Sequence, residues 1–410
     1  MNCRHCNHKL EHVFADLAFS PISNDMLTKE SFRTTENYYP LKVFVCEKCL
    51  LVQVDEFKKS EEIFDDSYTY FSSFSSTWRK HTATYTDMML QRFNYTKDSL
   101  VVEIASNDGC LLQNFTKHNI PVLGVEPTAN TAKEAEKKGV KTIVEFFSSD
   151  FAKKQFVKKQ HLADLIIGNN VLAHVPDIND FVDGMKLALK DTGVITMEFP
   201  HLMKLVEDCQ FDTIYHEHFS YFSFLAVKQI FESQDLEIFD VDEIPTHGGS
   251  LRIFAKHKEN RLLKVSFNVA ELIKKEHNEG MDRMQYYKGF QKRINKIKYD
   301  TLSFLIEEKK KGKKIIGYGA ASKGNTLLNY CGIKGTDLIE FIVDASPHKQ
   351  DKFLPGSHIP VVNEDKIKTY QPDYVIILPW NLKKEISKQL NYIREWEGKF
   401  VYFIPELTTL

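Results

Sequence analysis

Short runs of apolar residues recur through the middle of the chain, and each is followed by a longer segment in which apolar and charged residues mix. The runs cover residues 99–104, 121–125, 141–144, 164–167 and 193–198. Strands of a parallel sheet are buried on both faces, so they read as continuous apolar runs, and helices connect one strand to the next. The pattern therefore predicts an α/β fold with a doubly wound parallel sheet.

The pattern changes twice after this core. Apolar runs at 236–241 and 250–256 follow each other without a helix between them, which predicts an antiparallel addition to the sheet. Residues 258–312 are rich in lysine and glutamate and indicate a helical connector. A second strand–turn–helix unit begins at Lys314, and strands are expected again at 340–344 and 373–378. The chain thus ends in a second, smaller Rossmann-like α/β domain.

A chain of 410 residues exceeds what one hydrophobic core normally serves. We expect an N-terminal domain over residues 1–75, the core over 76–257, the connector over 258–312 and the C-terminal domain over 313–410. The net charge of −2 gives no general attraction to nucleic acid or to an anionic membrane. No apolar run approaches the roughly 20 residues that span a bilayer, and the first residues lack the apolar region of a secretory signal.

Two Cys-x-x-Cys pairs, Cys3/Cys6 and Cys46/Cys49, lie in the N-terminal segment. Each pair directs two thiolates to one point, and two pairs provide the four sulfurs of a tetrahedral zinc site without an open position. A redox dithiol is the alternative, but no strand–helix–strand pattern surrounds either pair. Seven cysteines, an odd number, also argue against a disulfide framework and fit a reducing, cytoplasmic compartment. We therefore expect a structural zinc ion.

The turn after the first core strand carries acidic and amide side chains in place of the glycines of a dinucleotide-binding loop. It reads Glu103-Ile104-Ala105-Ser106-Asn107-Asp108-Gly109. A pyrophosphate would be repelled by Asp108, whereas a cationic or zwitterionic cofactor would be attracted. The second strand ends in Glu126-Pro127, where a carboxylate can accept hydrogen bonds from ribose hydroxyls. These residues favour S-adenosylmethionine over NAD as the cofactor, with a purely structural turn as the alternative.

Asn169, Asn170 and His174 follow the fourth core strand, at the edge where such sheets bind ligands. We expect the two asparagines to contact the cofactor. His174 is a candidate for a catalytic contact to the substrate, and a structural histidine is the alternative.

Four ionisable side chains, Tyr215, His216, Glu217 and His218, lie in succession within an otherwise apolar segment that continues to Tyr221. Such a cluster is costly to bury unless it has a function. Neighbouring residues do not share one helix face, so they converge poorly on a metal ion. Proton transfer needs only one imidazole, and we therefore expect acid–base catalysis here. A hydrogen-bonded structural network is the alternative.

Three further sets are candidates for substrate binding. Paired glycines at Gly248 permit close approach of a ligand and Arg252 is suited to hold a phosphate, with a bulge or tight turn as the alternative. A glycine-containing turn leads into a helix start with Ser322, Lys323 and Asn325, where backbone amides and the lysine favour phosphate. Tyr70 belongs to a Tyr/Ser cluster that indicates either a substrate-facing loop or aromatic packing.

Taken together, these strings resemble one family along almost the whole chain, the sugar C-methyltransferases of deoxysugar biosynthesis. That family uses S-adenosylmethionine and acts on nucleotide-linked 4-keto sugars. The resemblance rests on the two cysteine pairs and on the strings at 103–109, 124–127, 169–175, 215–221, 248–252 and 317–325, in this order. The combination is specific, although no single string is.

The resemblance implies an N-terminal zinc domain, a class I methyltransferase core and a C-terminal domain that helps to hold a nucleoside-diphosphate sugar, with dTDP as the expected nucleotide. It implies that His218 is the base that removes the C3 proton, giving an enolate that takes the methyl group. Tyr215 and Glu217 would orient His218 or stabilise the enolate oxygen. His174, Tyr70 and Tyr221 would contact the sugar, and Lys323 and Asn325 the nucleotide or its diphosphate.

Two alternatives remain open at this point. One is an O- or N-methyltransferase acting on another small substrate with the same cofactor. The other is a zinc-ribbon interaction protein with a degenerate methyltransferase core, against which the net charge and the intact acidic turn both speak.

Overall fold

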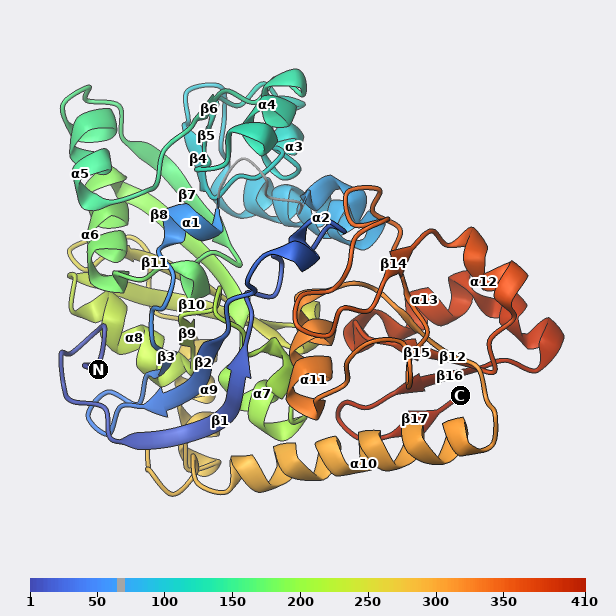
Figure 1. Ribbon diagram of the computed structural model, residues 1–410. Coiled ribbons are helices and arrows are strands. Elements are labelled where there is room, and N and C mark those ends of the chain that lie inside the picture. The colour runs from blue at the N-terminus through green and yellow to red at the C-terminus, as the bar shows by residue number, and fades with distance from the viewer. Residues whose placement is uncertain (65–70) are drawn as a thin grey trace.

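The computed structural model describes residues 1–64 and 71–410, and these residues form three β-sheets. Figure 1 shows the N-terminal sheet at the lower left, the large central sheet above it and the C-terminal sheet on the right. Tyr70, a predicted substrate contact, lies outside the described residues. Within the described part of the chain, no helix is both long and apolar enough to cross a bilayer.

The central sheet has seven strands in the order β10-β11-β8-β7-β4-β5-β6. The strands are β4 (Val101–Ile104), β5 (Val122–Val125), β6 (Thr142–Ile143), β7 (Ala163–Asn169), β8 (Leu189–Pro200), β10 (Leu236–Ile244) and β11 (Ser250–His257). Strands β6, β5, β4, β7 and β8 are parallel, and β11 and β10 add to β8 in antiparallel order. The doubly wound core and its antiparallel extension are thus confirmed.

Helices cover both faces of this sheet, because successive strand residues point to opposite sides. Val102, Ile104 and Ile166 belong to one hydrophobic cluster, and Val101, Leu165 and Ile167 to another. The helices are α2 (Ser76–Phe93), α3 (Leu112–Thr116), α4 (Ala129–Lys137), α5 (Ser149–Ala152), α6 (Ile178–Ala188) and α8 (Phe224–Glu232). Helix α7 (Leu202–Glu207) packs instead with residues of the N-terminal sheet and the C-terminal domain. Helix α2 packs into the second cluster, and the N-terminal cysteines pack into the first.

The N-terminal sheet is antiparallel, in the order β1-β2-β3-β9. Its strands are β1 (His12–Ser20), β2 (Tyr39–Val45), β3 (Val52–Val54) and β9 (Ser220–Tyr221). Short helices η1 (Ser31–Arg33), α1 (Ser60–Ile63) and η2 (Ser72–Phe74) belong to this half of the chain. The fourth strand comes from the segment that carries the predicted base, far along the chain from the other three.

The connector contains α9 (Phe267–Asn278) and α10 (Phe290–Lys310). Helix α10 runs along the lower side of the molecule from the N-terminal sheet to the C-terminal domain (Figure 1), and its Phe290 ring stacks on Phe14 of β1 with centroids 4.7 Å apart.

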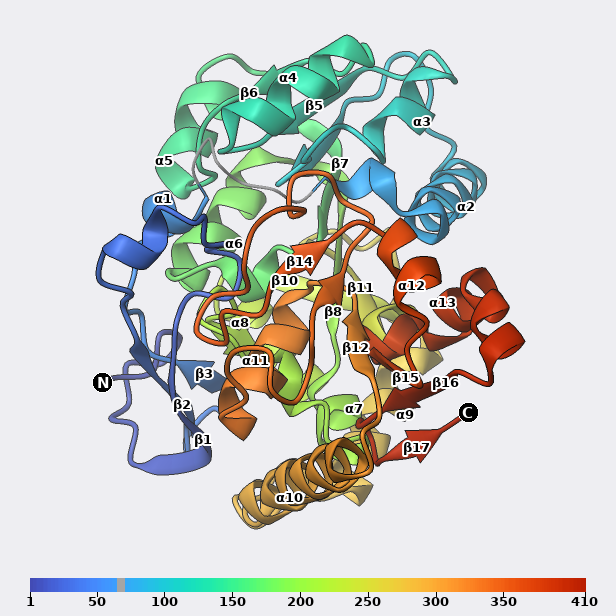
Figure 2. The ribbon, with the colours of Figure 1, turned by 45° about the vertical axis from the view of Figure 1, so that its right-hand side comes forward.

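The C-terminal domain has a six-stranded sheet in the order β14-β13-β12-β15-β16-β17. Its elements are β12 (Ile315–Tyr318), α11 (Ser322–Cys331), β13 (Ile342–Val343), β14 (Val361–Val362), α12 (Asp365–Tyr370), β15 (Tyr374–Ile377), α13 (Lys383–Gln389), β16 (Lys399–Tyr402) and β17 (Thr408–Thr409). All pairs are parallel except β16–β17. Helix α11 lies between the N-terminal sheet and β12, which the turned view shows clearly (Figure 2).

Candidate active site

The predicted cofactor residues gather at the carboxyl ends of β4, β5 and β7. The turn after β4 has positive φ angles at alternate positions, 54° at Ala105, 49° at Asn107 and 73° at Gly109. Glycine adopts this left-handed conformation freely, asparagine tolerates it and alanine is strained in it. The backbone therefore follows a path that favours three glycines although only one is present, and counting glycines could not reveal this.

This edge of the sheet holds several buried polar atoms without a protein partner. They are Glu103 Oε2, Ser106 Oγ, Asp108 Oδ1 and both amide atoms of Asn169. Burial and the neighbouring carboxylates raise the pKa of Glu103 well above its usual value. Buried polar atoms of this kind require ligand partners, and the carboxylate oxygens among them favour positive charge, so the edge fits a zwitterionic cofactor with an ammonium group.

Two of the predicted cofactor residues are already engaged by the chain itself. The Glu126 carboxylate accepts hydrogen bonds from the backbone N–H groups of Asn107, at 2.8 Å, and Thr128, at 3.0 Å. Asp108 Oδ2 forms an ion pair with Lys138 Nζ at 2.9 Å. Asp108 therefore does not present an uncompensated charge, and repulsion of a pyrophosphate is weaker than the sequence suggested. Pro127 and Asn170 follow β5 and β7 at the same edge.

The base segment, defined here as residues 211–221, begins with η5 (Phe211–Thr213) and ends in β9. Within it, Nδ1 of His218 lies 2.9 Å from the Thr213 carbonyl oxygen and Nε2 lies 2.9 Å from the Tyr215 hydroxyl. A carbonyl can only accept, so Nδ1 carries the hydrogen and the Tyr215 hydroxyl donates to Nε2. The ring is therefore held in the tautomer whose lone pair is on Nε2.

His174, from η4 (Leu172–His174), lies beside this base, and the two ring centroids are 4.7 Å apart. Its Nδ1 donates to the backbone carbonyl of Glu217. Burial lowers the pKa of His174 to about 4, and burial followed by the His174 charge lowers the pKa of His218 well below its usual value. Both imidazoles are therefore neutral at neutral pH, which is the state a proton acceptor needs.

Glu217 is buried and points toward the N-terminal domain. Its Oε1 accepts from the backbone and side-chain N–H groups of Asn24, at 3.3 and 3.2 Å, while Oε2 has no partner. Burial raises the pKa of this carboxyl to about 7. The sequence did not point to Asn24, because a single asparagine in a loop gives no indication that its partner is Glu217, far along the chain.

Two other members of the cluster take different places. His216 lies 3.2 Å from the Pro40 carbonyl oxygen and contacts Tyr39 and Phe57, with ring centroids 5.9 and 6.2 Å away. The hydroxyl of Tyr221 is buried and has no partner. His216 thus belongs to the packing of the N-terminal sheet, whereas Tyr221 remains available for a ligand.

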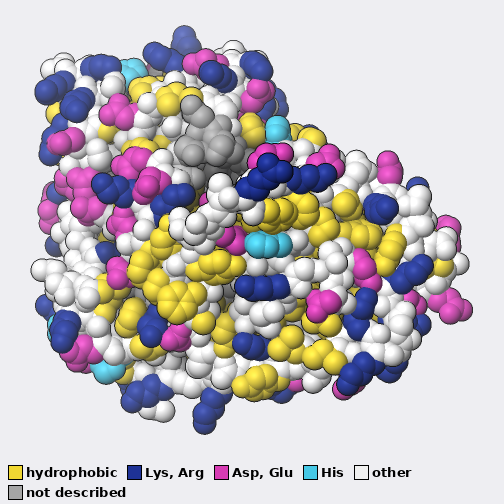
Figure 3. Space-filling view, in the orientation of Figure 1, with side chains coloured by type: hydrophobic (Ala, Val, Ile, Leu, Met, Phe, Trp, Pro, Cys, Tyr) yellow, Lys and Arg dark blue, Asp and Glu magenta, His cyan; other side chains and the backbone are white. Residues whose placement is uncertain are grey.

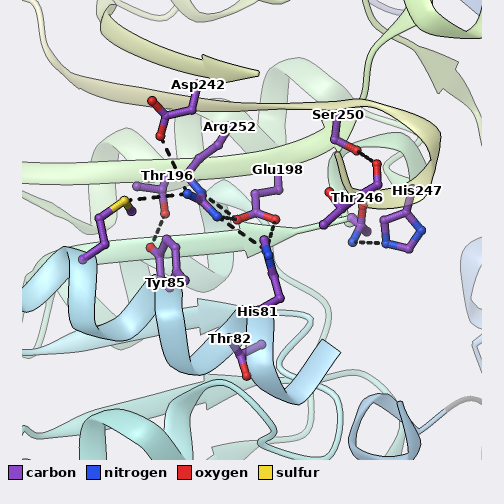
Figure 4. A network of polar contacts seen from close by, with 12 residues as sticks. His81, Thr82, Tyr85, Thr196, Glu198, Asp242, Thr246, His247, Ser250 and Arg252 are labelled. Carbon is purple, nitrogen blue, oxygen red and sulfur yellow. Dashed lines mark hydrogen bonds and ion pairs between the residues drawn. The ribbon is translucent and has the colours of Figure 1, made fainter. Parts of the chain in front are cut away.

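Arg252 is not available to a phosphate, which corrects its predicted role. Its guanidinium pairs with Glu198 of β8, with Nε 2.7 Å from Oε1, and lies 5.0 Å from the Tyr85 ring centroid. Glu198 also lies 2.8 Å from His81 of α2. Figure 4 shows this network joining α2 to β8 and β11. A carboxylate inside an apolar strand was the sequence signal that an internal cation partner exists.

Gly248 was expected to permit the close approach of a ligand. In the structure, a tryptophan of the C-terminal domain lies close to it instead. A Cβ atom on Gly248 would lie 2.4 Å from Trp380 of the C-terminal domain. The adjacent His247 accepts a hydrogen bond from the Asn170 side chain at 3.1 Å (Figure 4). Burial lowers the pKa of His247 to about 4, so its ring is neutral and accepts through Nε2.

The C-terminal domain brings α11 against the base segment. Ser322 starts this helix, Lys323 follows at its first turn, and Asn325 is fully buried with no partner for either amide atom. Trp380, which the sequence did not single out, donates from Nε1 to Asp212 of η5 at 2.7 Å. The predicted substrate residues of this domain therefore lie next to the predicted base.

Cys3, Cys6, Cys46 and Cys49 come together on the other side of the base segment, with sulfur atoms all within 4.8 Å of one another. Four sulfurs at the usual Zn–S distance of about 2.3 Å lie roughly 3.8 Å apart, so this arrangement fits a tetrahedral zinc ion. Within residues 1–64 and 71–410, the set consists of the four cysteines alone, which agrees with a structural site rather than a catalytic one.

The surface gives no sign of a nucleic-acid interface on the face that Figure 3 draws. Basic and acidic side chains are intermixed across it, and no continuous basic stripe is visible among the described residues. Backbone phosphates are normally met by clustered lysine and arginine.

Comparison with known proteins covers nearly the whole chain. Residues 3–64 match a zinc binding domain, residues 79–241 a methyltransferase domain, and residues 245–405 a C-methyltransferase C-terminal domain. The C-methyltransferase NovU of Streptomyces niveus is 33% identical over 404 residues, which cover 98% of this chain and 95% of NovU.

Two of the similar solved structures each cover less than half of this chain. The PH0226 protein from Pyrococcus horikoshii OT3 is 14% identical, with 46% of this chain and 95% of that chain covered and a TM-score of 0.37. Magnesium protoporphyrin IX methyltransferase from Synechocystis PCC 6803, with bound S-adenosylmethionine, is 13% identical, with 44% and 79% covered and a TM-score of 0.34. The match to NovU and the three domain matches show that the chain belongs to the S-adenosylmethionine-dependent C-methyltransferases with an N-terminal zinc-binding domain.

Proposed function

We propose that this enzyme methylates C3 of a nucleotide-linked 4-keto-deoxysugar, with His218 as the base that generates the enolate. The observation that carries the proposal is the fixed tautomer of His218, whose Nδ1–H is held by the Thr213 carbonyl at 2.9 Å. The His218 ring is neutral and buried, and its Nε2 lone pair can accept a proton next to the edge that fits the cofactor. A carbon acceptor requires such a base, because carbon is not nucleophilic until a proton next to a carbonyl is removed.

The reaction then follows from the placement of the side chains. The C3–H bond breaks as its proton moves to His218 Nε2, and a C3=C4 double bond forms with the negative charge on the C4 oxygen. The substrate takes the position of the Tyr215 hydroxyl on Nε2, and this hydroxyl then turns toward a sugar oxygen. S-adenosylmethionine, when bound at this edge, would supply a methyl group on a positively charged sulfur; the S–CH3 bond would break as the new bond to C3 forms, and S-adenosylhomocysteine would leave.

The remaining assignments belong to the same proposal. Glu103, Ser106, Asp108 and Asn169 offer unpartnered atoms to the cofactor, around the turn formed by Ala105, Asn107 and Gly109. His174, Tyr221 and Tyr70 are assigned to the sugar, and the C-terminal domain to the nucleotide, with dTDP as the proposed one. Four free thiolates for zinc require a reducing compartment, which supports the cytoplasm as the proposed location.

The test uses a dTDP-linked 4-keto-6-deoxysugar and S-adenosylmethionine with a labelled methyl group. The expected product carries the label on C3, as read from carbon–carbon couplings in its NMR spectrum. A methyl group on oxygen or nitrogen would overturn the proposal.

A second arm locates the base. Without a methyl donor, the wild-type enzyme should exchange the C3 proton with deuterated water, and His218→Asn should lower this exchange by about 100-fold or more. His216→Asn is the matched control, since His216 packs against the N-terminal sheet, and it should leave the exchange unchanged. Undiminished exchange in His218→Asn would assign the base elsewhere.

A further inference from the structure

One face of α11 runs along the start of the base segment. Lys323, Thr326 and Tyr330 are spaced i, i+3 and i+7, so they lie on the same side of the helix. The Thr326 hydroxyl donates to the Ile214 carbonyl at 3.0 Å, and the Tyr330 and Phe211 ring centroids are 5.6 Å apart. Lys323 therefore occupies the end of this face that lies beside the base.

The ammonium group of Lys323 has few partners. It donates to the Asn381 side chain at 3.1 Å and lies 4.7 Å from the Trp380 ring centroid. Among the described residues, no carboxylate forms an ion pair with it within 4.0 Å, although Asp212 accepts a hydrogen bond from Nε1 of the same Trp380. Donor capacity and positive charge thus remain available to a ligand.

Two nearby buried side chains also have polar atoms without a hydrogen-bond partner. Asn325, two residues along α11, is fully buried and neither atom of its amide has a partner. Asp212 is also buried, and its Oδ1 has no partner. A buried amide without partners is costly in an apolar setting, so it marks a place where a polar ligand atom belongs.

The charge of Lys323 affects the pKa of the base. It lies close enough to His218 and His247 to lower the pKa of each, after the larger effect of burial. Burial also lowers the pKa of Lys323, and the Asp212 carboxylate opposes that change. A cation and a neutral base thus share one small region.

We propose that Lys323 is a catalytic residue whose ammonium group stabilises the enolate oxygen. This inference rests on the function proposed above. As the C3 proton moves to His218, the electron pair of the C3–H bond forms C3=C4 and the C4 carbonyl becomes an oxyanion, which accepts hydrogen bonds from Lys323. The charge disappears again when C3 takes the methyl group and the C4 carbonyl re-forms.

This differs from the diphosphate contact expected from the sequence. A diphosphate carries negative charge on several oxygens, whereas Lys323 brings one half-buried ammonium to the side of the base. An oxyanion is a single atom whose charge exists only during the reaction, so one preorganised cation in a site shielded from water has its largest effect there.

The test separates chemistry from nucleotide binding in Lys323→Met. We expect C3-proton exchange without methyl donor, and kcat with it, to fall by about 100-fold or more. The Kd of dTDP, measured by calorimetry, should change less than about threefold. A Kd weakened more than tenfold with unchanged exchange would assign Lys323 to the diphosphate and overturn the inference.

Lys298→Met is the matched control, because Lys298 on α10 also lies over an aromatic ring, 4.6 Å from the Tyr330 centroid, but away from the base. It should exchange the C3 proton at the wild-type rate. Lys323→Gln keeps a donor without charge and should fall between wild type and Lys323→Met; it also decides the matter if the methionine variant does not fold.

Failure of this inference can be told apart from failure of the proposed function. If the wild-type enzyme neither exchanges the C3 proton nor forms a carbon-bound methyl group, the proposed function is wrong. If the wild type exchanges, His218→Asn does not and Lys323→Gln exchanges at the wild-type rate, only the role of Lys323 is wrong.

Discussion

The base segment is held from two sides in two different ways. On the N-terminal side the attachment is a backbone ladder, in which β9 pairs with β3 and the Val54 N–H donates to the Phe219 carbonyl at 3.0 Å. On the C-terminal side the attachment consists of side chains, with Trp380 bonded to Asp212 and Thr326 bonded to Ile214. One side fixes the path of the backbone, whereas the other contacts it at separate points.

The zinc site is part of the first attachment. Gln53 of β3 is fully buried, its Nε2 donates to Cys3 Sγ at 3.2 Å and its Oε1 accepts from the Arg4 backbone N–H at 2.9 Å. Gln53 is also paired with Ser220 in the sheet. The Arg4 guanidinium lies 5.2 Å from the Phe219 ring centroid. A metal centre remote from the chemistry is thus connected to the residue next to His218.

The two sides of the base segment therefore have different tasks. A shift of one residue in a β-ladder turns every side chain to the opposite face, so backbone pairing sets the direction in which His218 points. Side-chain contacts can adjust without changing that direction. The N-terminal side therefore orients the base, and the C-terminal side can adapt to the substrate.

The largest effect should come from zinc removal, which breaks the first attachment. Extraction with a chelator, or Cys46→Ser, is expected to lower activity by about 100-fold, because small displacements of a catalytic group have costs of this size. Amide hydrogen exchange of β3 and β9 should rise at the same time, while that of β12 and β15 stays unchanged. Cys331→Ala, a buried cysteine of the C-terminal domain, is the control and should keep one zinc per chain. Full activity in a zinc-free protein would contradict the connection.

The pH dependence of stability that Glu217 causes is a test of the N-terminal side. The folded protein raises the pKa of this carboxyl from 4.5 to about 7, so burial favours its protonated form. Its contribution to stability is full below pH 4.5 and is lost as the pH rises through 7, which amounts to about 3 kcal/mol.

The measurement compares urea unfolding of Glu217→Gln and wild type between pH 4.5 and 8. Relative to wild type, the free energy of unfolding of Glu217→Gln should rise by about 3 kcal/mol as the pH rises from 4.5 to 8. Glu243→Gln, at an exposed ion pair with Lys275, is the control. A difference that stays constant with pH would show that Glu217 is ionised at all these values.

Trp380→Phe addresses the C-terminal side. It removes the N–H donor from a buried carboxylate, and we expect a loss of about 2 kcal/mol in the free energy of unfolding. Amide exchange of β9 should not change, because the ladder to β3 is intact. Trp396→Phe removes a donor to the Pro372 carbonyl instead of a carboxylate and should cost about 1 kcal/mol. Faster amide exchange at β9 in Trp380→Phe would mean that the C-terminal side also holds the backbone, and would contradict the division of tasks between the two sides.

The smallest effect is expected at Ala105, which touches neither attachment. Ala105→Gly relieves roughly 1–2 kcal/mol of left-handed strain but adds about 0.5–1 kcal/mol of chain entropy to the unfolded state. The net gain should be about 0.5 kcal/mol, visible as a slightly higher melting temperature. Ala132→Gly in the helix α4 should lower it instead. A lower melting temperature for Ala105→Gly would mean that the alanine methyl group makes a contact worth more than the strain.

The central sheet could be predicted because its strands are continuous apolar runs, most of them separated by helical segments. The strand β9 could not, since its two residues are too few to show any alternation and its partner lies in another domain. The cysteine pairs were recognisable because ligand spacing is local. The bond between Asp212 and Trp380 carries no such local signal.

The residues of the site divide in the same way. Acidic and histidine residues in apolar surroundings were found because burying them is costly. Their partners were missed, since the Asn24 bond to Glu217 and the Glu198 bond to Arg252 depend on tertiary contacts. The turn at 105–109 was described by its side chains, while its backbone conformation became apparent only from the φ angles.

The closing of the N-terminal sheet by β9 also concerns how the protein is made. During synthesis, β1, β2 and β3 leave the ribosome long before Ser220, so the edge of β3 stays open while the methyltransferase core is being translated. Open edges with apolar residues such as Val52 and Val54 attract strands of other chains. The nascent N-terminal domain is therefore the part of this enzyme most dependent on early zinc loading or a chaperone.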